Sequence, residues 1–108
     1  MSTEDVVREA IAARRAIFLV YRGGATRVVQ PHALYRAAGG RVLLDAYQVA
    51  GESSSGELPG WREFDLAQTS DVEPLDERFA IAPGFDPGAV KYRRGVLAMV
   101  SAPRRAAR

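Results

Sequence analysis

The chain begins with a helical pattern of apolar residues and continues with patterns typical of strands. The apolar residues that fall on one side of the first turns are Val6, Val7, Ala10 and Ile11. Ser2 or Thr3 can cap the first turn, because a hydroxyl oxygen accepts a bond from an exposed backbone N–H. Basic residues near the other end complement the helix dipole. The sequence therefore predicts an amphipathic helix that begins at Ser2 or Thr3 and ends at Arg15.

Short runs of β-branched and aromatic residues predict a series of strands after the helix. These runs cover residues 17–21, 26–37, 41–49, 61–67 and 69–75. Gly23-Gly24 and Gly39-Gly40 mark tight turns between them. Pro31 cannot donate a hydrogen bond to a neighbouring strand, so the second run must lie at an edge or bend at a bulge. The pattern predicts a mainly β protein, with the N-terminal helix packed on a small, strongly bent antiparallel sheet or open barrel.

The predicted elements divide the chain into three parts. These are an N-terminal helix over residues 1–15, a β domain over residues 16–82 and a C-terminal extension over residues 83–108. In the extension, residues 89–101 suit either a short helix or a strand, and Gly95 weakens the helix. We expect residues 102–108 to form a disordered basic end, and the serine-rich stretch 51–57 to be a mobile loop tip.

Composition narrows the class of protein. A length of 108 residues, 47% apolar and 26% charged, fits one globular domain with a single core. The absence of cysteine excludes disulfides, thiolate metal sites and cysteine nucleophiles. The polar and acidic start, Met1-Ser2-Thr3-Glu4-Asp5, lacks the features of a secretory signal, and no apolar run is long enough to span a bilayer. We therefore expect a cytoplasmic protein without a membrane partner.

Charge is distributed unevenly along the chain. Residues 1–41 carry seven arginines and three acids, residues 42–86 carry two arginines and ten acids, and residues 87–108 carry six basic residues and no acid. Basic ends thus flank an acidic middle. This arrangement can attract a polyanion to one surface, or the ends can fold against the middle and neutralise it.

Candidate catalytic chemistry is sparse. His32 is the only histidine, so any histidine-based dyad, triad or metal site would depend on this one residue. Acids such as Glu63 and Asp65, spaced by two on a strand, face solvent as readily as a substrate. The paired glycines lack the spacing and the following helix of a phosphate-binding loop. The sequence predicts no enzyme, no catalytic residue, no metal site and no cofactor.

An ordered set of motifs between Ala16 and Phe79 resembles the WYL domain, a small β-rich sensor module of bacterial transcriptional regulators. The motifs are Ala10-Ile11 ahead of Phe18-Leu19-Val20-Tyr21, Arg27-Val28-Val29-Gln30-Pro31 with Leu34, Asp45-Ala46-Tyr47, and Arg62-Glu63-Phe64-Asp65-Leu66 with Phe79. Val42-Leu43-Leu44 stands in the place of the tripeptide that names the family. The resemblance covers a little over half of the chain and implies a small Sm-like or SH3-like barrel of about five strands.

The resemblance also implies a binding groove, which in that family is associated with nucleotides or single-stranded nucleic acid. Carried over by position, the groove would involve Tyr21, Arg27, Leu43, Tyr47 and Arg62. Alternation places Arg62 on the core side of its strand, where a guanidinium must find a carboxylate, carbonyl groups or an incoming anion. Two other interpretations stay open. Arg62 pairs internally with Asp45 or another acid, and the tyrosines are half-buried sheet residues.

Two functions follow as hypotheses. The first is a non-enzymatic, stand-alone sensing domain that binds an anionic ligand, such as a nucleotide or single-stranded nucleic acid, beside Arg62. Besides the N-terminal helix, the sequence predicts no pair of helices that could form a helix-turn-helix. An effect on transcription would therefore require a partner regulator chain or a homo-oligomer. The alternative is a protein interaction module without a small ligand, in which a sheet edge or the face of residues 42–49 contacts another subunit.

Overall fold

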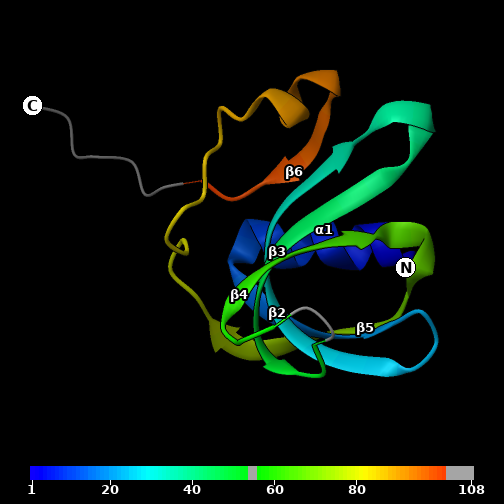
Figure 1. Cartoon of the computed structure of the whole chain (residues 1–108), viewed down its shortest axis with the longest axis vertical. Coiled ribbons are helices and arrows are strands. Elements are labelled where there is room, and N and C mark those ends of the chain that lie inside the picture. The colour runs from blue at the N-terminus through cyan, green and yellow to red at the C-terminus, as the bar shows by residue number, and fades with distance from the viewer. Residues whose placement is uncertain (54–55, 102–108) are drawn as a thin grey trace, which may run out of the picture.

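The N-terminal helix and five of the six strands lie close to the ranges that the sequence pattern predicts. This computed structural model describes residues 1–53 and 56–101, and Figure 1 shows the arrangement of the elements. Helix α1 is Thr3–Ala13, and the strands are β1 (Arg15–Tyr21), β2 (Ala25–Arg36), β3 (Val42–Gly51), β4 (Gly60–Asp65), β5 (Thr69–Arg78) and β6 (Val96–Met99). Three short 3-10 helices are η1 (Ala38–Gly40), η2 (Leu66–Gln68) and η3 (Val90–Arg94). The prediction of a mainly β protein with an N-terminal helix is confirmed.

Capping fixes both ends of α1. The Ser2 hydroxyl accepts a hydrogen bond from the Asp5 backbone N–H at 3.1 Å, and the Asp5 carboxylate accepts one from the Ser2 backbone. At the other end Arg14 adopts a left-handed conformation, with φ of 53°, and the chain enters β1 at Arg15. The helix therefore ends slightly before the predicted Arg15.

The six strands form one antiparallel sheet in the order β4-β3-β2-β1-β5, with β6 paired to β2 beside this path. Strand β2 is long enough to pair with β1 along its first half and with β6 along its second half. Its pairing with β3 shifts register between Val28 and Val29 and again between Pro31 and Ala33, and the second shift is a bulge, one of the two positions that the sequence allowed for Pro31. Among the described residues, the edge strands β4 and β5 do not pair with each other, so the sheet bends toward a barrel without closing.

The main core lies between α1 and the sheet face that we call the inner face. Its buried side chains come from the helix, the first four strands and residues 79–101, which we call the C-terminal segment. They include Val7, Ile11, Ile17, Leu19, Val29, Leu34, Leu44, Phe64, Phe79 and Val100. A smaller cluster, Ala33, Tyr35, Leu43 and Tyr92, lies on the opposite, outer face. The inner face is thus closed by the helix and the outer face by the C-terminal segment.

The C-terminal segment belongs to the fold as far as residue 101. Residues 89–101 contain both elements that the sequence left open, because η3 leads into β6. Tyr92 and Val100 are buried, and the Val100 backbone N–H donates to the His32 carbonyl oxygen at 2.8 Å. The predicted disordered end at 102–108 and residues 54–55 of the predicted mobile tip lie outside the described residues. Among the described residues, no helix has the length and apolar composition needed to span a membrane.

Candidate functional site

The two faces of the sheet separate the five residues that the sequence placed in one groove. Residues directly opposite each other on antiparallel strands point to the same face. Arg62 pairs with Ala46, whose side chain belongs to the main core, so Arg62 lies on the inner face. Tyr47 pairs with Trp61 and therefore lies on the outer face, as does Leu43 in the smaller cluster. Tyr21, Arg27 and Arg62 share the inner face, whereas Leu43 and Tyr47 lie on the other side.

Arg27 is a nearly buried cation on the inner face, with 9% of its surface exposed. The centre of its guanidinium lies 5.7 Å from the Tyr21 ring centroid and 5.5 Å from that of Phe64. Its Nη1 donates to the Gln48 amide oxygen at 3.1 Å, and its buried Nε has no hydrogen-bond acceptor. No carboxylate of the described residues forms an ion pair with it. Arg27 is thus held by aromatic rings and one amide.

Arg62 is also held by uncharged oxygen atoms. Its Nη1 donates to its neighbour Trp61's carbonyl oxygen at 2.8 Å. Its Nη2 donates to the Ser53 hydroxyl at 2.7 Å and to the Glu57 carbonyl oxygen at 3.2 Å. Its Nε is buried without an acceptor. The alternative pairing with Asp45 does not occur, since Asp45 lies on the outer face, and within the described residues no other acid pairs with this guanidinium.

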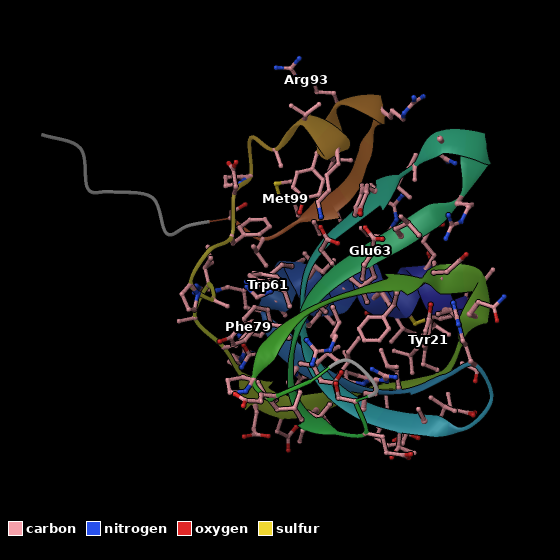
Figure 2. The ribbon with its side chains drawn as sticks, in the orientation of Figure 1. Tyr21, Trp61, Glu63, Phe79, Arg93 and Met99 are labelled. Carbon is pink, nitrogen blue, oxygen red and sulfur yellow. The ribbon has the colours of Figure 1, made fainter. Side chains whose placement is uncertain are left out.

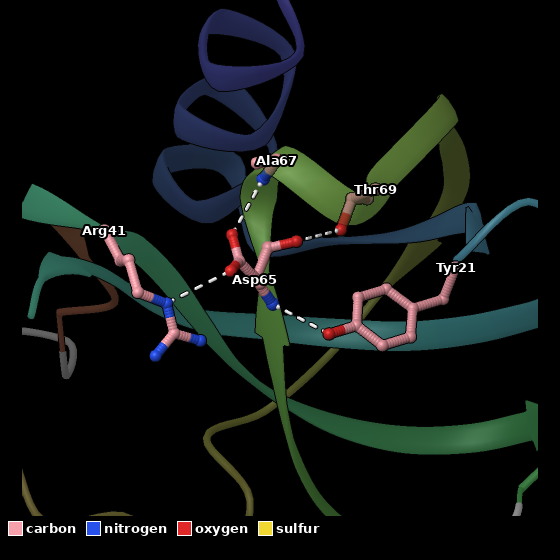
Figure 3. A network of polar contacts seen from close by, with 5 residues as sticks. All are labelled: Tyr21, Arg41, Asp65, Ala67 and Thr69. Atoms are coloured by element: carbon pink, nitrogen blue, oxygen red, sulfur yellow. Dashed lines mark hydrogen bonds and ion pairs between the residues drawn. The ribbon is translucent and has the colours of Figure 1, made fainter.

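Tyr21 lies beside Arg27 and also has a structural role. Its ring meets Phe64 edge-on, with centroids 4.9 Å apart, and its hydroxyl accepts a hydrogen bond from the Asp65 backbone N–H at 3.1 Å. Figure 3 shows how Asp65 joins this contact to three others, since its side chain also accepts from Arg41 and from the Ala67 backbone, and its carbonyl oxygen accepts from Thr69. The Tyr21 hydroxyl therefore helps to hold the bend between β4 and η2.

The loop after β3 is fastened to the strand that carries Arg27. The Glu52 backbone N–H donates to the Thr26 carbonyl oxygen at 2.8 Å, and the Gln48 amide nitrogen donates to the Glu52 carbonyl oxygen at 2.8 Å. Gly51 makes this approach possible, because it has φ of 95° and a Cβ there would lie 2.7 Å from the Arg27 Cα. Gln48 thus connects the loop to the Arg27 guanidinium.

A pocket of about 370 Å³ opens on the outer face between β4 and the C-terminal segment. It is lined by Asp45, Trp61, Arg62, Glu63, Gly84, Phe85, Asp86, Ala89, Lys91 and Tyr92. Figure 2 shows Trp61 and Glu63 on the side of β4 that faces this segment, with Tyr21 on the other side. Tyr47 packs edge-on against Trp61, with centroids 5.3 Å apart, and so lies beside the pocket. The pocket therefore combines aromatic walls with charged groups.

A buried polar network forms one wall of the pocket. Asp45 is 5% exposed, and its Oδ2 accepts from the Tyr92 hydroxyl at 2.6 Å and pairs with the Lys91 ammonium at 2.6 Å. The Tyr35 hydroxyl lies 2.5 Å from a Glu63 carboxylate oxygen and 3.3 Å from Asp45 Oδ1. Burial raises the pKa of Tyr35, and its hydrogen bond to Glu63 adds to this effect. Burial and the hydrogen bond to Asp45 raise the pKa of Tyr92.

His32 connects the bulge of β2 to the C-terminal segment. Its Nε2 accepts a hydrogen bond from the Ala82 backbone N–H at 3.0 Å, and its Nδ1 lies 2.8 Å from the Gln30 carbonyl oxygen. These partners assign the proton of the neutral ring to Nδ1. The ring packs among Trp61, Phe79 and Phe85, and burial lowers its pKa. Both nitrogens are therefore used in holding the fold.

The pocket residues Phe85, Asp86, Lys91 and Tyr92 were not singled out as a site from the sequence. The one available signal was Asp45, whose alternation places an acid between Leu43 and Tyr47 on a partly apolar strand face. A buried acid requires partners, but its sequence neighbours do not reveal them. Within the described residues, no group of three or more histidine or acidic side chains is placed to hold a metal ion.

Comparisons of the chain with protein-family models, with curated proteins and with solved structures found no match.

Proposed function

We propose that this protein is a cytoplasmic, non-enzymatic ligand-binding domain of the WYL-like regulatory type, and that it binds an anionic group beside Arg27 and Arg62. The observation that carries this proposal is the pair of guanidinium groups on the inner face. Each donates only to uncharged oxygens of the described residues, and each has a buried Nε without an acceptor.

The physical argument rests on the cost of burying a charge. A guanidinium cannot lose its proton, so it must be stabilised by its surroundings. Aromatic faces and amide oxygens compensate only part of the lost hydration, whereas an anion supplies a full opposite charge and several acceptors. A bound phosphate or carboxylate would therefore gain more from Arg27 and Arg62 than from an exposed arginine.

A nucleotide or single-stranded nucleic acid is the proposed ligand class, with a phosphate group at the two arginines. The regulatory role is supported by the WYL resemblance alone. Since α1 is the one α-helix among the described residues, this part of the chain has no helix-turn-helix. Regulation would then act through a partner chain or through a homo-oligomer.

The test is calorimetric titration of the whole protein with inorganic phosphate, a nucleoside monophosphate and a short single-stranded oligonucleotide. Arg62→Gln and Arg27→Gln keep hydrogen-bonding capacity and remove one positive charge each. We expect each to weaken binding about tenfold or more, as loss of a charge-assisted contact does. The matched control is Arg93→Gln, because Arg93 is exposed on η3 and its side chain makes no described hydrogen bond or ion pair.

Salt dependence and folding controls make the result decisive. Affinity for the oligonucleotide should fall steeply with salt concentration if phosphates are contacted. Circular dichroism and thermal unfolding verify that each variant is folded. Equal binding by wild type, Arg62→Gln and Arg27→Gln would refute the site, and so would an equal loss in Arg93→Gln.

A further inference from the structure

We propose that the pocket on the outer face binds a small primary alkylammonium compound, with the ammonium at Glu63 and Asp86 and the alkyl chain against Trp61 and Phe85. This inference concerns the opposite face of the sheet from Arg27 and does not depend on the anion site. Three observations support it: the charges of the residues that line the pocket, the Lys91 ammonium bound to Asp45, and the aromatic wall of Trp61 and Phe85.

Acidic side chains outnumber basic side chains in the lining of the pocket. Three carboxylates line it, those of Asp45, Glu63 and Asp86, against the one ammonium of Lys91. Arg62 also contributes to the lining, but its guanidinium donates to Ser53, Glu57 and the Trp61 backbone, so it is committed to the loop before β4. That guanidinium keeps its positive charge, so a cation entering the pocket meets three negative and two positive groups, an excess of one negative charge.

Lys91 demonstrates how an alkylammonium group fits this environment. Its ammonium lies 2.6 Å from Asp45 Oδ2 and 5.6 Å from the ring centroids of both Tyr35 and Tyr92. Carboxylate and aromatic faces together form a favourable site for an ammonium ion. The Lys91 side chain is 48% exposed, so its position is open to solvent and to exchange.

The other two carboxylates retain acceptor capacity. Glu63 Oε2 accepts from Tyr35, and Asp86 Oδ1 accepts from the Gly88 backbone N–H at 2.9 Å. The second oxygen of each carboxylate accepts no hydrogen bond from the described residues. Both residues are exposed, so an ammonium can reach the second oxygen of each carboxylate from solvent.

The aromatic wall is fixed before any ligand arrives. Trp61 and Phe85 lie with their ring centroids 6.0 Å apart and an angle of 25° between their planes. The Trp61 indole N–H donates to the Pro83 carbonyl oxygen at 2.9 Å, and a Cβ at Gly84 would lie 3.4 Å from this indole nitrogen. A rigid apolar wall beside carboxylates suits a short alkyl chain that ends in an ammonium group.

The experiment is a fluorescence titration with n-pentylammonium, because Trp61 is the only tryptophan of the chain and lines the pocket. We expect a saturable change in its emission. The neutral compound n-pentanol, which has the same chain length, should bind at least about tenfold more weakly, since it lacks the charge. The double variant Glu63→Gln/Asp86→Asn should lose about tenfold or more in affinity for n-pentylammonium. The charge-matched control Asp71→Asn/Glu73→Gln changes two exposed acids of β5 and should bind as wild type does.

A second variant tests the role of Lys91 in the opposite direction. Lys91→Met keeps the length of the side chain and removes its ammonium, so Asp45 becomes available to the ligand, and binding of n-pentylammonium should tighten about tenfold. Circular dichroism verifies that this variant is folded, and the same check applies to Glu63→Gln/Asp86→Asn because Glu63 accepts a hydrogen bond from the buried Tyr35. Equal affinity for n-pentanol and n-pentylammonium would overturn the proposal. Equal affinity in Glu63→Gln/Asp86→Asn and in wild type would also overturn it.

Discussion

Arg62 and Glu63 are adjacent in β4, and their side chains lie on opposite faces of the sheet. Arg62 lies on the core side, opposite Ala46, while Glu63 lies opposite Asp45 and contacts the Tyr35 hydroxyl on the outer face. The inner face thus holds cations without acidic partners among the described residues, and the outer face holds an excess of carboxylates. One short strand separates two environments of opposite charge because alternate residues of a strand point in opposite directions.

Phe64 is predicted to be a major contributor to stability. It is buried in the main core, contacts Tyr21 edge-on and lies beneath the Arg27 guanidinium. Phe64→Ala should lower the free energy of unfolding by about 3–5 kcal/mol, because it leaves a cavity and removes a cation–π contact. Urea unfolding measures this loss. Val49→Ala, at a position 37% exposed, serves as the control and should change stability by less than about 0.5 kcal/mol.

Replacing Gly51, which pairs with Arg27 at the end of β3, is predicted to lower stability. An added Cβ would lie 2.7 Å from the Arg27 Cα, and the residue has φ of 95°. Gly51→Ala should therefore cost at least about 2 kcal/mol of stability by adding a steric clash to backbone strain. Gly39 has a positive φ of 77°, but an added Cβ there would have no atom within 4 Å, so Gly39→Ala should cost only about 1 kcal/mol. Equal thermal unfolding temperatures for the two variants would contradict this prediction.

Alkaline pH is predicted to destabilise the protein through Tyr35 and Tyr92. Burial and nearby carboxylates raise the pKa of both phenols. The folded protein holds these protons more tightly than the unfolded chain, so the free energy of unfolding is unaffected below pH of about 10 and falls as the pH rises beyond it. Absorbance of phenolate at alkaline pH should show a fraction of tyrosine that ionises late, above pH of about 10. The late fraction should shrink in Tyr35→Phe and in Tyr92→Phe.

Mildly acidic pH is predicted to destabilise the protein through His32. Burial lowers the pKa of its imidazole, which outweighs the opposite effects of the Gln30 hydrogen bond and the Asp45 charge. The unfolded chain therefore binds a proton more readily, and the contribution of His32 to stability is present above pH of about 6.5 and is lost as the pH falls below it. Because His32 is the only histidine, its ring resonances in an NMR titration report the pKa directly. A midpoint above about 6.5 would contradict the prediction.

The charge pattern of the sequence is explained in part by ion pairs within the fold. Arg15 pairs with Asp76 at 3.4 Å, Arg41 pairs with Asp65 at 3.2 Å, and Lys91 pairs with Asp45. Each of these pairs joins a basic end of the chain to the acidic middle. Folding of the ends against the middle therefore accounts for these charges, whereas Arg27 and Arg62 have no such acidic partner among the described residues.

The sequence by itself determined α1 and the strands β1 to β5, and it left residues 89–101 open between a helix and a strand. The helical period located α1, the turn glycines separated the strands, and Pro31 restricted its part of β2 to an edge or a bulge, because each depends on residues close together in the chain. Alternation also placed Arg62 and Phe64 on one face.

Only the tertiary structure decided which distant residues meet. It turned Leu43 and Tyr47 away from Arg62, and it brought Tyr92 and Lys91 to Asp45 by folding the C-terminal segment over the outer face. Local periodicity carries no information on such pairs, since they depend on strand register and on the path of the connecting loops, which are set when the whole core packs together.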